Sequence, residues 1–452
     1  MSVRMGLDEA VELALRHASS LGVSGVEVYG SHYKRLTINA SQGRIKSVLY
    51  NDESGIGIRL SLEGRVVFSY LNTLDASSIR SFVEKTYRAL RSSPVDPMFK
   101  GFYPPDGEYN IPRDIYSPSI AVKLSDPTDL IENIRSAVSE FDTDKFKVTW
   151  LYAGIGEAKQ VIANSEGVFE EASTTFARMF ADTIAVDGSN RSPSVYEAEG
   201  WRNRIPDPVK LLSKARDKAF RSLKREKLDL SGEFNVILTP EGFIELFNAT
   251  YGEALLGVSY VNKSSPFRDK LDEQIAPECF TVIDNPQAPG KMGSIPFDGE
   301  GAPTYAKRVI DRGVLKTFLF NHYYAQIAGV HTTGNASRAG YTSPPGISWS
   351  NIEIEPGEAR LEELLEEGNV ILVERIQGVF NAKFQTGDYG GAGTPSWFYR
   401  KGGEEISLGS ISVSGNIYSD LLKQCTATRE VEDKGSLRAP YIMFKAKVHQ
   451  IG

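Results

Sequence analysis

The chain has 452 residues, of which 41% are hydrophobic and 24% charged, and its net charge at neutral pH is -7. This length predicts two or three domains, and the composition is that of a soluble globular protein. The acidic balance argues against a general nucleic-acid binder, which needs a basic surface. No stretch approaches the roughly 18 apolar residues of a membrane helix, and the first residues lack the apolar run of a signal peptide. We therefore expect a cytoplasmic protein with neither nucleic-acid nor membrane partners.

Residues 1–93 predict an α+β domain. Apolar residues at helical spacing indicate an amphipathic helix over 7–21, and a second helix begins near Asp75. Between the two helices, five short segments rich in β-branched and aromatic residues predict strands. Turn residues such as Ser41-Gln42-Gly43 and Glu63-Gly64 separate them. These segments are VEVYG, RLTINA, RIKSVLY, GIGIRLSL and RVVFSYL.

A connector and a second α+β unit are predicted next. Residues 94–126 are rich in proline, which removes backbone donors and biases its neighbour to extended geometry, so we expect an ordered connector without regular elements. Residues 127–230 predict a middle domain with one helix, strands at KVTWLYAGIG and QVIANS, and a basic helix that ends at Leu228.

Residues 231–452 predict a β-rich domain. The strand FNVILT is followed by a helix that begins at Pro240, and the remainder is mostly strand and turn with many glycines. This pattern favours an antiparallel barrel or sandwich. The chain as a whole is predicted to be α+β, with N-terminal helix and antiparallel-sheet domains followed by this C-terminal barrel or sandwich domain.

The stretch TGDYGGAGTPSWFY, residues 386–399, contains four glycines and one carboxylate, Asp388. It has no lysine of the kind that a P-loop requires, and no helix follows it as in a Rossmann loop. It predicts a tight turn between strands, where glycines let another chain approach the backbone closely.

A metal site made by this chain alone is not predicted. The five histidines are scattered, and no H-E-x-x-H motif is present. Only His331 lies in a polar, glycine-bearing stretch, where a hydrogen-bonding or packing role is more common than metal ligation. The two cysteines, Cys279 and Cys425, cannot by themselves build a cysteine-based zinc site.

Two carboxylate pairs are candidates for chemistry. Glu241 and Glu245 are four residues apart on a predicted helix and share one face, which is either solvated or functional. Asp298 and Glu300 lie among glycines and prolines, where loops often present functional groups, and we weigh a turn and an acid–base pair equally. No G-x-S-x-G elbow supports a serine nucleophile.

An ordered series of phrases resembles the TldD/PmbA family, once called modulators of DNA gyrase, and specifically its PmbA (TldE) branch. The resemblance covers most of the chain, with NSEGV in the middle and SGIGIRLSLEGRVVFSYLNTLD near the start. The phrases in the C-terminal half are SPFRDKL, GSIPFDGEGAPT, RGVLKTFLFN, HTTGNASRAG, QGVFNAKFQTGDYGGAGTPSWFY and ISVSGNIYSDLL.

The resemblance implies one subunit of a peptidase made of two related chains. The TldD-type subunit carries H-E-x-x-x-H on a helix and a later cysteine, and it holds the catalytic metal. Here the corresponding helix opens at Pro240 and places Ile244 and Ala249 at the two histidine positions, with Glu245 at the glutamate. Zinc catalysis needs about three N, S or O ligands and an open position. We therefore expect no metal and no cofactor in this chain, and zinc in a TldD-type partner.

The resemblance also implies the partners and the site. We expect a heterodimer with a TldD-type metallopeptidase subunit, or a homodimer, that binds peptide or unfolded protein. No catalytic residue is expected, and Glu245 is the only candidate. The residues expected to line a substrate cleft are Asp298, Glu300, His331, Thr333, Asn335, Asp388, Tyr389 and Asn416.

Two alternatives to the subunit interpretation are kept. The chain is an autonomous hydrolase if Asp298, Glu300, Glu245 or Asp388 converge in one cleft with a perturbed pKa. It is a regulatory protein-binding module if it captures a target other than a TldD-type chain.

Overall fold

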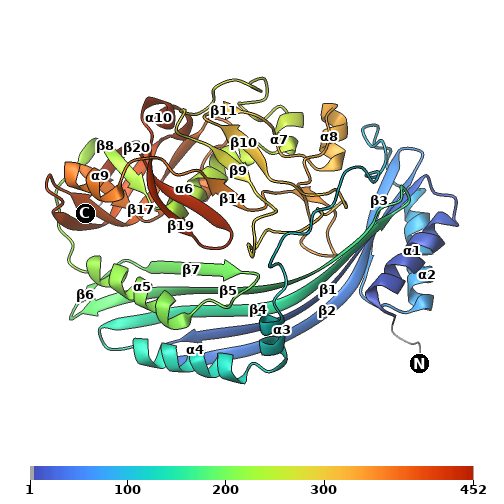
Figure 1. Cartoon of the computed structure of the whole chain (residues 1–452), viewed down its shortest axis with the longest axis horizontal. Coiled ribbons are helices and arrows are strands. Elements are labelled where there is room, and N and C mark those ends of the chain that lie inside the picture. Colours follow the sequence, from blue (N-terminus) through green and yellow to red (C-terminus); the bar gives the residue numbers. More distant parts are fainter. Residues whose placement is uncertain (1–4, 451–452) are drawn as a thin grey trace.

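The computed structural model describes residues 5–450, and these form two bodies that face each other (Figure 1). The first body is a long, curved sheet with helices, and the second is the C-terminal half of the chain. We call them the sheet body and the barrel body.

The sheet body is built on four strands of 17–19 residues each. At about 3.3 Å per residue, such a strand spans roughly 60 Å. The strand order is β3-β2-β1-β4-β5-β6, and β7 also pairs with β5. The strands are β1 (Gly25–Ser41), β2 (Arg44–Leu62), β3 (Arg65–Leu71), β4 (Phe146–Asn164), β5 (Phe169–Asp187), β6 (Asn190–Arg191) and β7 (Val195–Trp201).

Strands from both predicted N-terminal units share this sheet. β1 pairs with β2 and, over residues 27–40, also with β4, always antiparallel. Segments 1–93 and 127–230 therefore build a single layer, and their limits as separate domains stay predictions.

The observed strands are longer than those predicted from the sequence, because pairs of predicted segments join into single strands. VEVYG and RLTINA are both parts of β1, RIKSVLY and GIGIRLSL are parts of β2, and KVTWLYAGIG and QVIANS are parts of β4. The hairpin turns are where the turn residues predicted them: Gln42 and Gly43 have φ of 50° and 71°. Two successive positive φ values match the right-handed twist of a two-residue hairpin.

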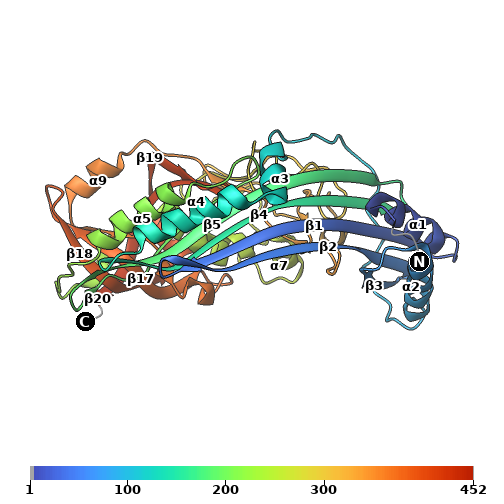
Figure 2. The same cartoon turned by 90° about the horizontal axis from the view of Figure 1, so that it is seen from below.

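Five helices cover the sheet face opposite to the barrel body (Figure 2). α1 and α2 pack on one end of the sheet, while α3, α4 and α5 pack on the other. The expected helices near residues 7, 75 and 128 are confirmed, and Asp75 caps α2 by accepting from Ser77 and Ser78. The helices are α1 (Leu7–Ser19), α2 (Ala76–Leu90), α3 (Pro118–Ser125), α4 (Thr128–Phe141) and α5 (Pro208–Arg221).

Two details of this region differ from the sequence-based expectation. The connector was expected to lack regular elements, but it contains α3, whose Pro118 occupies the first turn, where the missing N–H costs nothing. α5 ends at Arg221 and not at Leu228. Ser222 N–H closes its last turn, and the chain then leaves toward the barrel body.

The barrel body contains a closed ring of five strands. β8, β15, β17, β18 and β20 pair in succession, and β20 returns to β8. This confirms the β-rich barrel, although β8 and β15 run parallel, so the ring is mixed and not purely antiparallel. The strands are β8 (Ser231–Leu238), β9 (Val282–Asp284), β10 (Lys307–Asp311), β11 (Val314–Leu315), β12 (Ala336–Ser337), β13 (Gly346–Ile347), β14 (Ile352–Ile354), β15 (Val370–Val373), β16 (Ile376–Gln377), β17 (Asp388–Tyr399), β18 (Glu405–Asn416), β19 (Thr426–Asp433) and β20 (Leu437–Gln450).

Helices fill and flank the ring. α6 packs its phenylalanines into the main core of the barrel body, which explains its hydrophobic sequence. The helices are α6 (Pro240–Phe247), α7 (Gly257–Val261), α8 (His322–Ala328), α9 (Leu361–Glu367) and α10 (Ile417–Lys423), with a π-helical turn η1 (Asn248–Gly252) and a 3₁₀ turn η2 (Val379–Asn381).

The glycine-rich stretch is a strand, and the expectation of a tight turn was wrong. Its residues from Asp388 onward form β17, which pairs with β16 and β18. A Cβ on Gly391 would lie 2.2 Å from the carbonyl oxygen of Gln377. The glycine therefore permits close approach of a neighbouring segment, as expected, but that segment belongs to the same chain.

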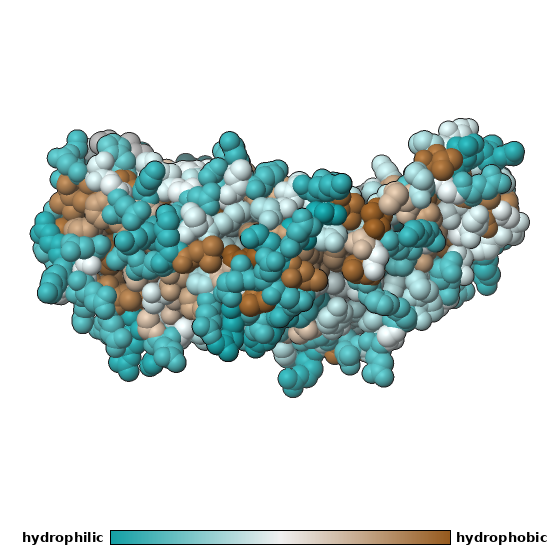
Figure 3. Space-filling model, turned by 90° about the horizontal axis from the view of Figure 1, so that it is seen from above, coloured by the Kyte–Doolittle hydropathy of each residue, from teal (hydrophilic) through white to brown (hydrophobic). Residues whose placement is uncertain are grey.

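The face seen from above is mostly hydrophilic (Figure 3). Seen from above, hydrophobic residues form small groups separated by hydrophilic ones (Figure 3). Across residues 5–450, no helix combines the length and apolar character needed to cross a bilayer.

Candidate functional site

The helix α6 begins beside the segment that follows β15. Thr239 caps it by accepting a hydrogen bond from Gly242 N–H at 3.2 Å and donates to the carbonyl of Glu374 at 2.7 Å. A Cβ on Gly242 would lie 2.3 Å from that carbonyl, so glycine is required for this approach. The contact brings Arg375 next to the exposed side of α6.

A π turn follows α6 directly. In η1 the N–H of Glu253 donates to the carbonyl of Asn248, five residues earlier. A π turn contains more residues than an α turn and brings positions five apart closer to one face, and such turns are frequent at functional sites. Ile244 and Ala249 are five apart and line two adjoining cavities beside this turn.

Arg375 holds the carboxylate of Glu245 in a two-pronged ion pair. Nε of Arg375 donates to Oε2 of Glu245 at 3.0 Å, and Nη2 contacts Oε1. The guanidinium also lies 4.4 Å from the ring centroid of Tyr196 on β7. Burial acts to lower the pKa of Arg375, but the bonds to Glu245 hold that pKa above its usual value.

The two cavities form one cleft. Their volumes are about 620 and 650 Å³, and both are lined by Glu245, Asn248, Glu253 and Arg375. The first also reaches β5 and β7 of the sheet body, so the cleft lies between the two bodies. Volumes of this size are typical of ligand sites.

The side chains at the head of this cleft do not fit a zinc ion. Ile244 and Ala249 have no donor atoms, and both oxygens of Glu245 face a guanidinium. Zinc needs about three ligands of N, S or O type. These side chains therefore cannot supply the ligand set of a catalytic zinc ion.

A cluster of buried charges supports the wall of the cleft. Lys434 lies 2.7 Å from Oε2 of Glu241 and 3.5 Å from Oε2 of Glu197, and Lys218 lies 2.5 Å from Oε1 of Glu197. Lys218 also pairs with Glu374. Although burial acts to raise it, the two ammonium groups hold the pKa of Glu197 below its usual range. The cluster joins α5 and β7 of the sheet body to the barrel body.

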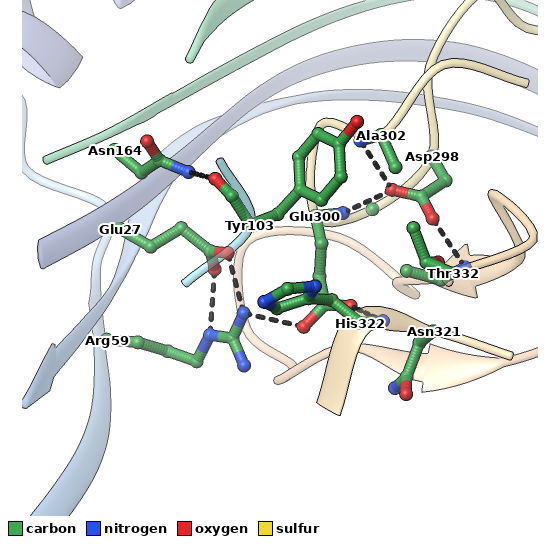
Figure 4. Close-up of polar contacts among 12 residues, drawn as sticks. Glu27, Arg59, Tyr103, Asn164, Asp298, Glu300, Ala302, Asn321, His322 and Thr332 are labelled. Atoms are coloured by element: carbon green, nitrogen blue, oxygen red, sulfur yellow. Dashed lines mark hydrogen bonds and ion pairs between the residues drawn. The ribbon is translucent and has the colours of Figure 1, made fainter. Parts of the chain in front are cut away.

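A second buried network joins the bodies at the other end (Figure 4). Arg59 donates to both oxygens of Glu27, at 2.8 and 2.6 Å, and to Oε1 of Glu300 at 2.9 Å. Arg338 pairs with Glu27 as well. The backbone N–H of His322 donates to Oε2 of Glu300 at 2.7 Å. The side chains of Glu27, Glu300 and Arg338 are 1–2% exposed, so the network is shielded from water.

The predicted pair Asp298 and Glu300 therefore lies in the interior, and the two side chains have different roles. Glu300 is ion-paired with Arg59. Asp298 organises its loop by accepting three backbone hydrogen bonds, from Glu300, Ala302 and Ala336, at 2.8–3.0 Å. Burial, together with the nearby Glu300 carboxylate, raises the pKa of Asp298 to about 7.

This raised pKa predicts a pH-dependent stability. Between pH 5 and 7 the folded chain binds a proton at Asp298 that the unfolded chain releases, so the free energy of unfolding falls as the pH rises and levels off above 7. Between pH 5 and 8, the free energy of unfolding of Asp298→Asn should fall by about 2–3 kcal/mol less than that of the wild type. Urea unfolding at both pH values measures this. Asp388→Asn, at an exposed carboxylate, is the control, and equal slopes for wild type and Asp298→Asn would contradict the prediction.

Three more of the residues predicted to line the cleft lie close together in the sequence, but their exposure to solvent differs. His331 is exposed. Thr333 is buried and accepts from the N–H of Phe320 at 2.7 Å. Asn335 is buried, donates to Asp284 at 2.7 Å and, with Asp298, lines a cavity of about 250 Å³.

Asp388, Tyr389 and Asn416 lie together at one end of the β17–β18 pair. Asn416 donates to Oδ1 of Asp388 at 2.9 Å and caps α10. Tyr389 is 5% exposed, points into the core, and its hydroxyl has no hydrogen-bond partner among the described residues. None of the three lines the cleft at α6. Their role in substrate binding stays a prediction.

The sequence did not predict a role for the arginines of these networks. One signal was available: Glu27 and Arg59 are charged residues within otherwise apolar strand segments, VEV and IRL. A charge in such a place is rarely buried unless it is paired. Arg375 has no comparable signal.

Comparisons with known proteins identify the fold class. Three models of one metallopeptidase family match in order: PmbA/TldA metallopeptidase domain 1 over residues 26–90, the central domain over 117–223 and the C-terminal domain over 231–450. The fold is thus that of a metallopeptidase family. The chain belongs to the PmbA/TldD family, as its sequence phrases predicted.

Similar proteins cover nearly the whole chain. Metalloprotease PmbA of Escherichia coli O157:H7 is 24% identical over 450 residues, covering 97% of this chain and 94% of that protein. A metalloprotease of Methanocaldococcus jannaschii is 25% identical over 414 residues, covering 88% of each. The crystal structure of TldE from Thermococcus kodakarensis has a TM-score of 0.86 at 22% identity, covering 97% of this chain and 100% of that one. This likeness confirms the α+β fold.

Proposed function

We propose that this chain is the metal-free, peptide-binding subunit of a cytoplasmic two-chain peptidase, whose zinc is held by a TldD-type partner. The supporting observation is the chemistry at α6. The π turn and the cleft are present, but two aliphatic side chains stand where imidazoles would be needed, and Arg375 occupies the carboxylate of Glu245.

The cleft is suited to an extended peptide. Tyr196 and the run from Ala198 to Gly200 of β7 line it, so the cleft follows this strand. Among the described strands, β7 pairs only with β5. At Gly200 the other edge is occupied, because the N–H of Gly200 donates to the carbonyl of Lys434 at 3.1 Å. The rest of that edge can accept a peptide strand through backbone hydrogen bonds, the mode called β-augmentation.

The test is metal content together with partner-dependent hydrolysis. The purified chain should contain almost no zinc by elemental mass spectrometry and should not cleave peptides alone. Addition of a metal-bearing TldD-type chain should restore hydrolysis. One zinc per chain, or hydrolysis without the partner, would contradict the proposal.

Substitution of Glu245 gives a sharper prediction. With no metal-bound water to activate, Glu245→Gln should leave partner-dependent hydrolysis within about threefold, whereas loss of a general base costs about 10²-fold or more. Steady-state kinetics of the reconstituted complex measures the change. Glu253→Gln, which removes another carboxylate of the same cleft, is the matched control. A hundredfold loss confined to Glu245→Gln would show that this carboxylate acts in the chemistry.

An autonomous carboxylate hydrolase is the second candidate. Its one supporting observation is that Asp298 has a pKa raised to about 7 and borders a cavity. Substrate could bind the carboxylate of Asp298 only if the three hydrogen bonds from backbone N–H groups to that carboxylate were broken. This requirement favours the subunit role. Hydrolysis by the chain alone that disappears in Asp298→Asn would favour this candidate instead.

A further inference from the structure

A separate cavity of about 580 Å³ lies between the sheet and residues 338–342 of the barrel body. Side chains from β1, β4 and β5 form its floor, and residues 338–342 of the barrel body form part of its wall. We call it the arginine pocket, because Arg35, Arg178, Arg202 and Arg338 all line it.

The charges of the arginine pocket are unbalanced. Its only carboxylate is Glu53, and the charge of Arg338 is already met by Glu27. Within residues 5–450, Arg35, Arg178 and Arg202 form no ion pair with a carboxylate at 4.0 Å or less. The pocket therefore holds excess positive charge.

Arg202 is the most informative of these cations. Its Nε is buried without a hydrogen-bond partner among the described residues, and its Nη1 reaches only the carbonyl of Thr175, at 3.4 Å. Burial alone lowers the pKa of Arg202, to about 10. The backbone of Arg202 is fixed, since its N–H donates to Gly290 at 2.9 Å and its carbonyl accepts from Thr175. A buried cation held in this way lacks an anion.

The floor of the pocket is aromatic. Tyr33 and Phe176 stack with centroids 5.6 Å apart and an interplanar angle of 6°. Gly156 on β4 makes room for them, because a Cβ there would lie 2.3 Å from Cζ of Phe176. A ligand that combines an anionic group with an apolar or aromatic group matches these walls.

The arginine pocket adjoins the cleft at α6. Arg178 and Met292 line both. The two cavities therefore share these side chains, and we expect a chain that lies along the cleft to reach the arginine pocket past them.

We propose that the arginine pocket binds the C-terminal carboxylate of a peptide, with Arg202 and Arg178 as its partners and the aromatic floor under the last side chain. This inference rests on the proposed peptide-binding function and adds the substrate class, peptides with a free C-terminus. Charge-assisted bonds from arginine to carboxylate are among the strongest that a site can offer.

The experiment is fluorescence anisotropy with the full chain and an N-terminally labelled apolar pentapeptide that ends in phenylalanine, as the free acid and as the amide. The acid should bind roughly tenfold or more tightly than the amide, because the amide cannot accept a charge-assisted pair. Arg202→Gln should abolish this difference. Arg178→Gln should reduce the difference in affinity between acid and amide. Because Arg178 is exposed, this substitution should not destabilise the fold. Arg204→Gln, at a nearby arginine paired with Glu199 outside the pocket, is the matched control and should leave that difference unchanged.

The outcomes separate the two proposals. Equal binding of acid and amide would overturn the pocket assignment and leave the peptide-binding subunit standing. Absence of binding by both peptides, with no stimulation of the partner, would overturn both. Tight binding of an amidated peptide that ends in glutamate would assign the pocket to a side-chain carboxylate and overturn its assignment to the C-terminus.

Discussion

Replacing Arg59 by methionine is expected to lower the free energy of unfolding by about 3–5 kcal/mol, since removal of one partner leaves buried charges uncompensated. Among the described residues, Glu27 would keep only Arg338 as an ion-pair partner, and Glu300 would keep none. Urea unfolding followed by circular dichroism at pH 7 measures the change. The side chains of both carboxylates are 1–2% exposed, so water cannot replace the guanidinium.

The matched control for Arg59→Met is Arg135→Met on α4. Arg135 pairs with Glu132, and both side chains are more than half exposed. An exposed pair contributes about 0–1 kcal/mol. A loss below about 1 kcal/mol for Arg59→Met, or losses of equal size at both positions, would show that the network does not hold the bodies together.

Lys434→Met is expected to lower the free energy of unfolding by a similar amount, about 3 kcal/mol, and the size of this loss should depend on pH. Without the ammonium group, Glu197 loses a charge that favours its ionised form, so its folded-state pKa rises. The folded chain then binds more protons than the unfolded chain at mildly acidic pH, and the variant becomes less destabilised as the pH falls.

Thermal or urea unfolding of Lys434→Met at pH 5 and pH 8 tests this. The difference from wild type should be larger at pH 8. Lys445→Met is the control, because Lys445 and its partner Glu233 are both about half exposed. A destabilisation that is equal at the two pH values would mean that Lys434 does not set the pKa of Glu197.

Local features of the fold could be predicted from the sequence, and the extent of its strands could not. Asp75 is a capping residue followed by an apolar helical pattern, and Gln42-Gly43 is a hairpin signal, so the helix start and the turn were both foreseen. The middle of β1 carries His32, Tyr33 and Lys34, whose polarity resembles a break between strands. Its continuity depends on pairing with β2 and β4 on both sides, which is tertiary information.

The candidate site was only partly predictable for a similar reason. The helix at Pro240 could be located because its cap and apolar residues are local. The ion pair between Glu245 and Arg375 joins residues 130 positions apart, and that between Glu27 and Arg338 joins residues 311 positions apart. No short motif encodes such pairs. Asp298 and Glu300 were recognised as a notable pair, but their burial follows from the docking of the two bodies.

The closure of the five-strand ring has a consequence for synthesis of the protein on the ribosome. β8 pairs on one side with β15 and on the other with β20, through Leu238 and Ile442. The edge of β8 stays open until β20 has been translated, and the entropy of closing so long a loop delays the pairing further. An open edge is a template for wrong pairing. The sheet body, whose strands end at Trp201, can form well before then and present its surface as a platform on which the ring closes.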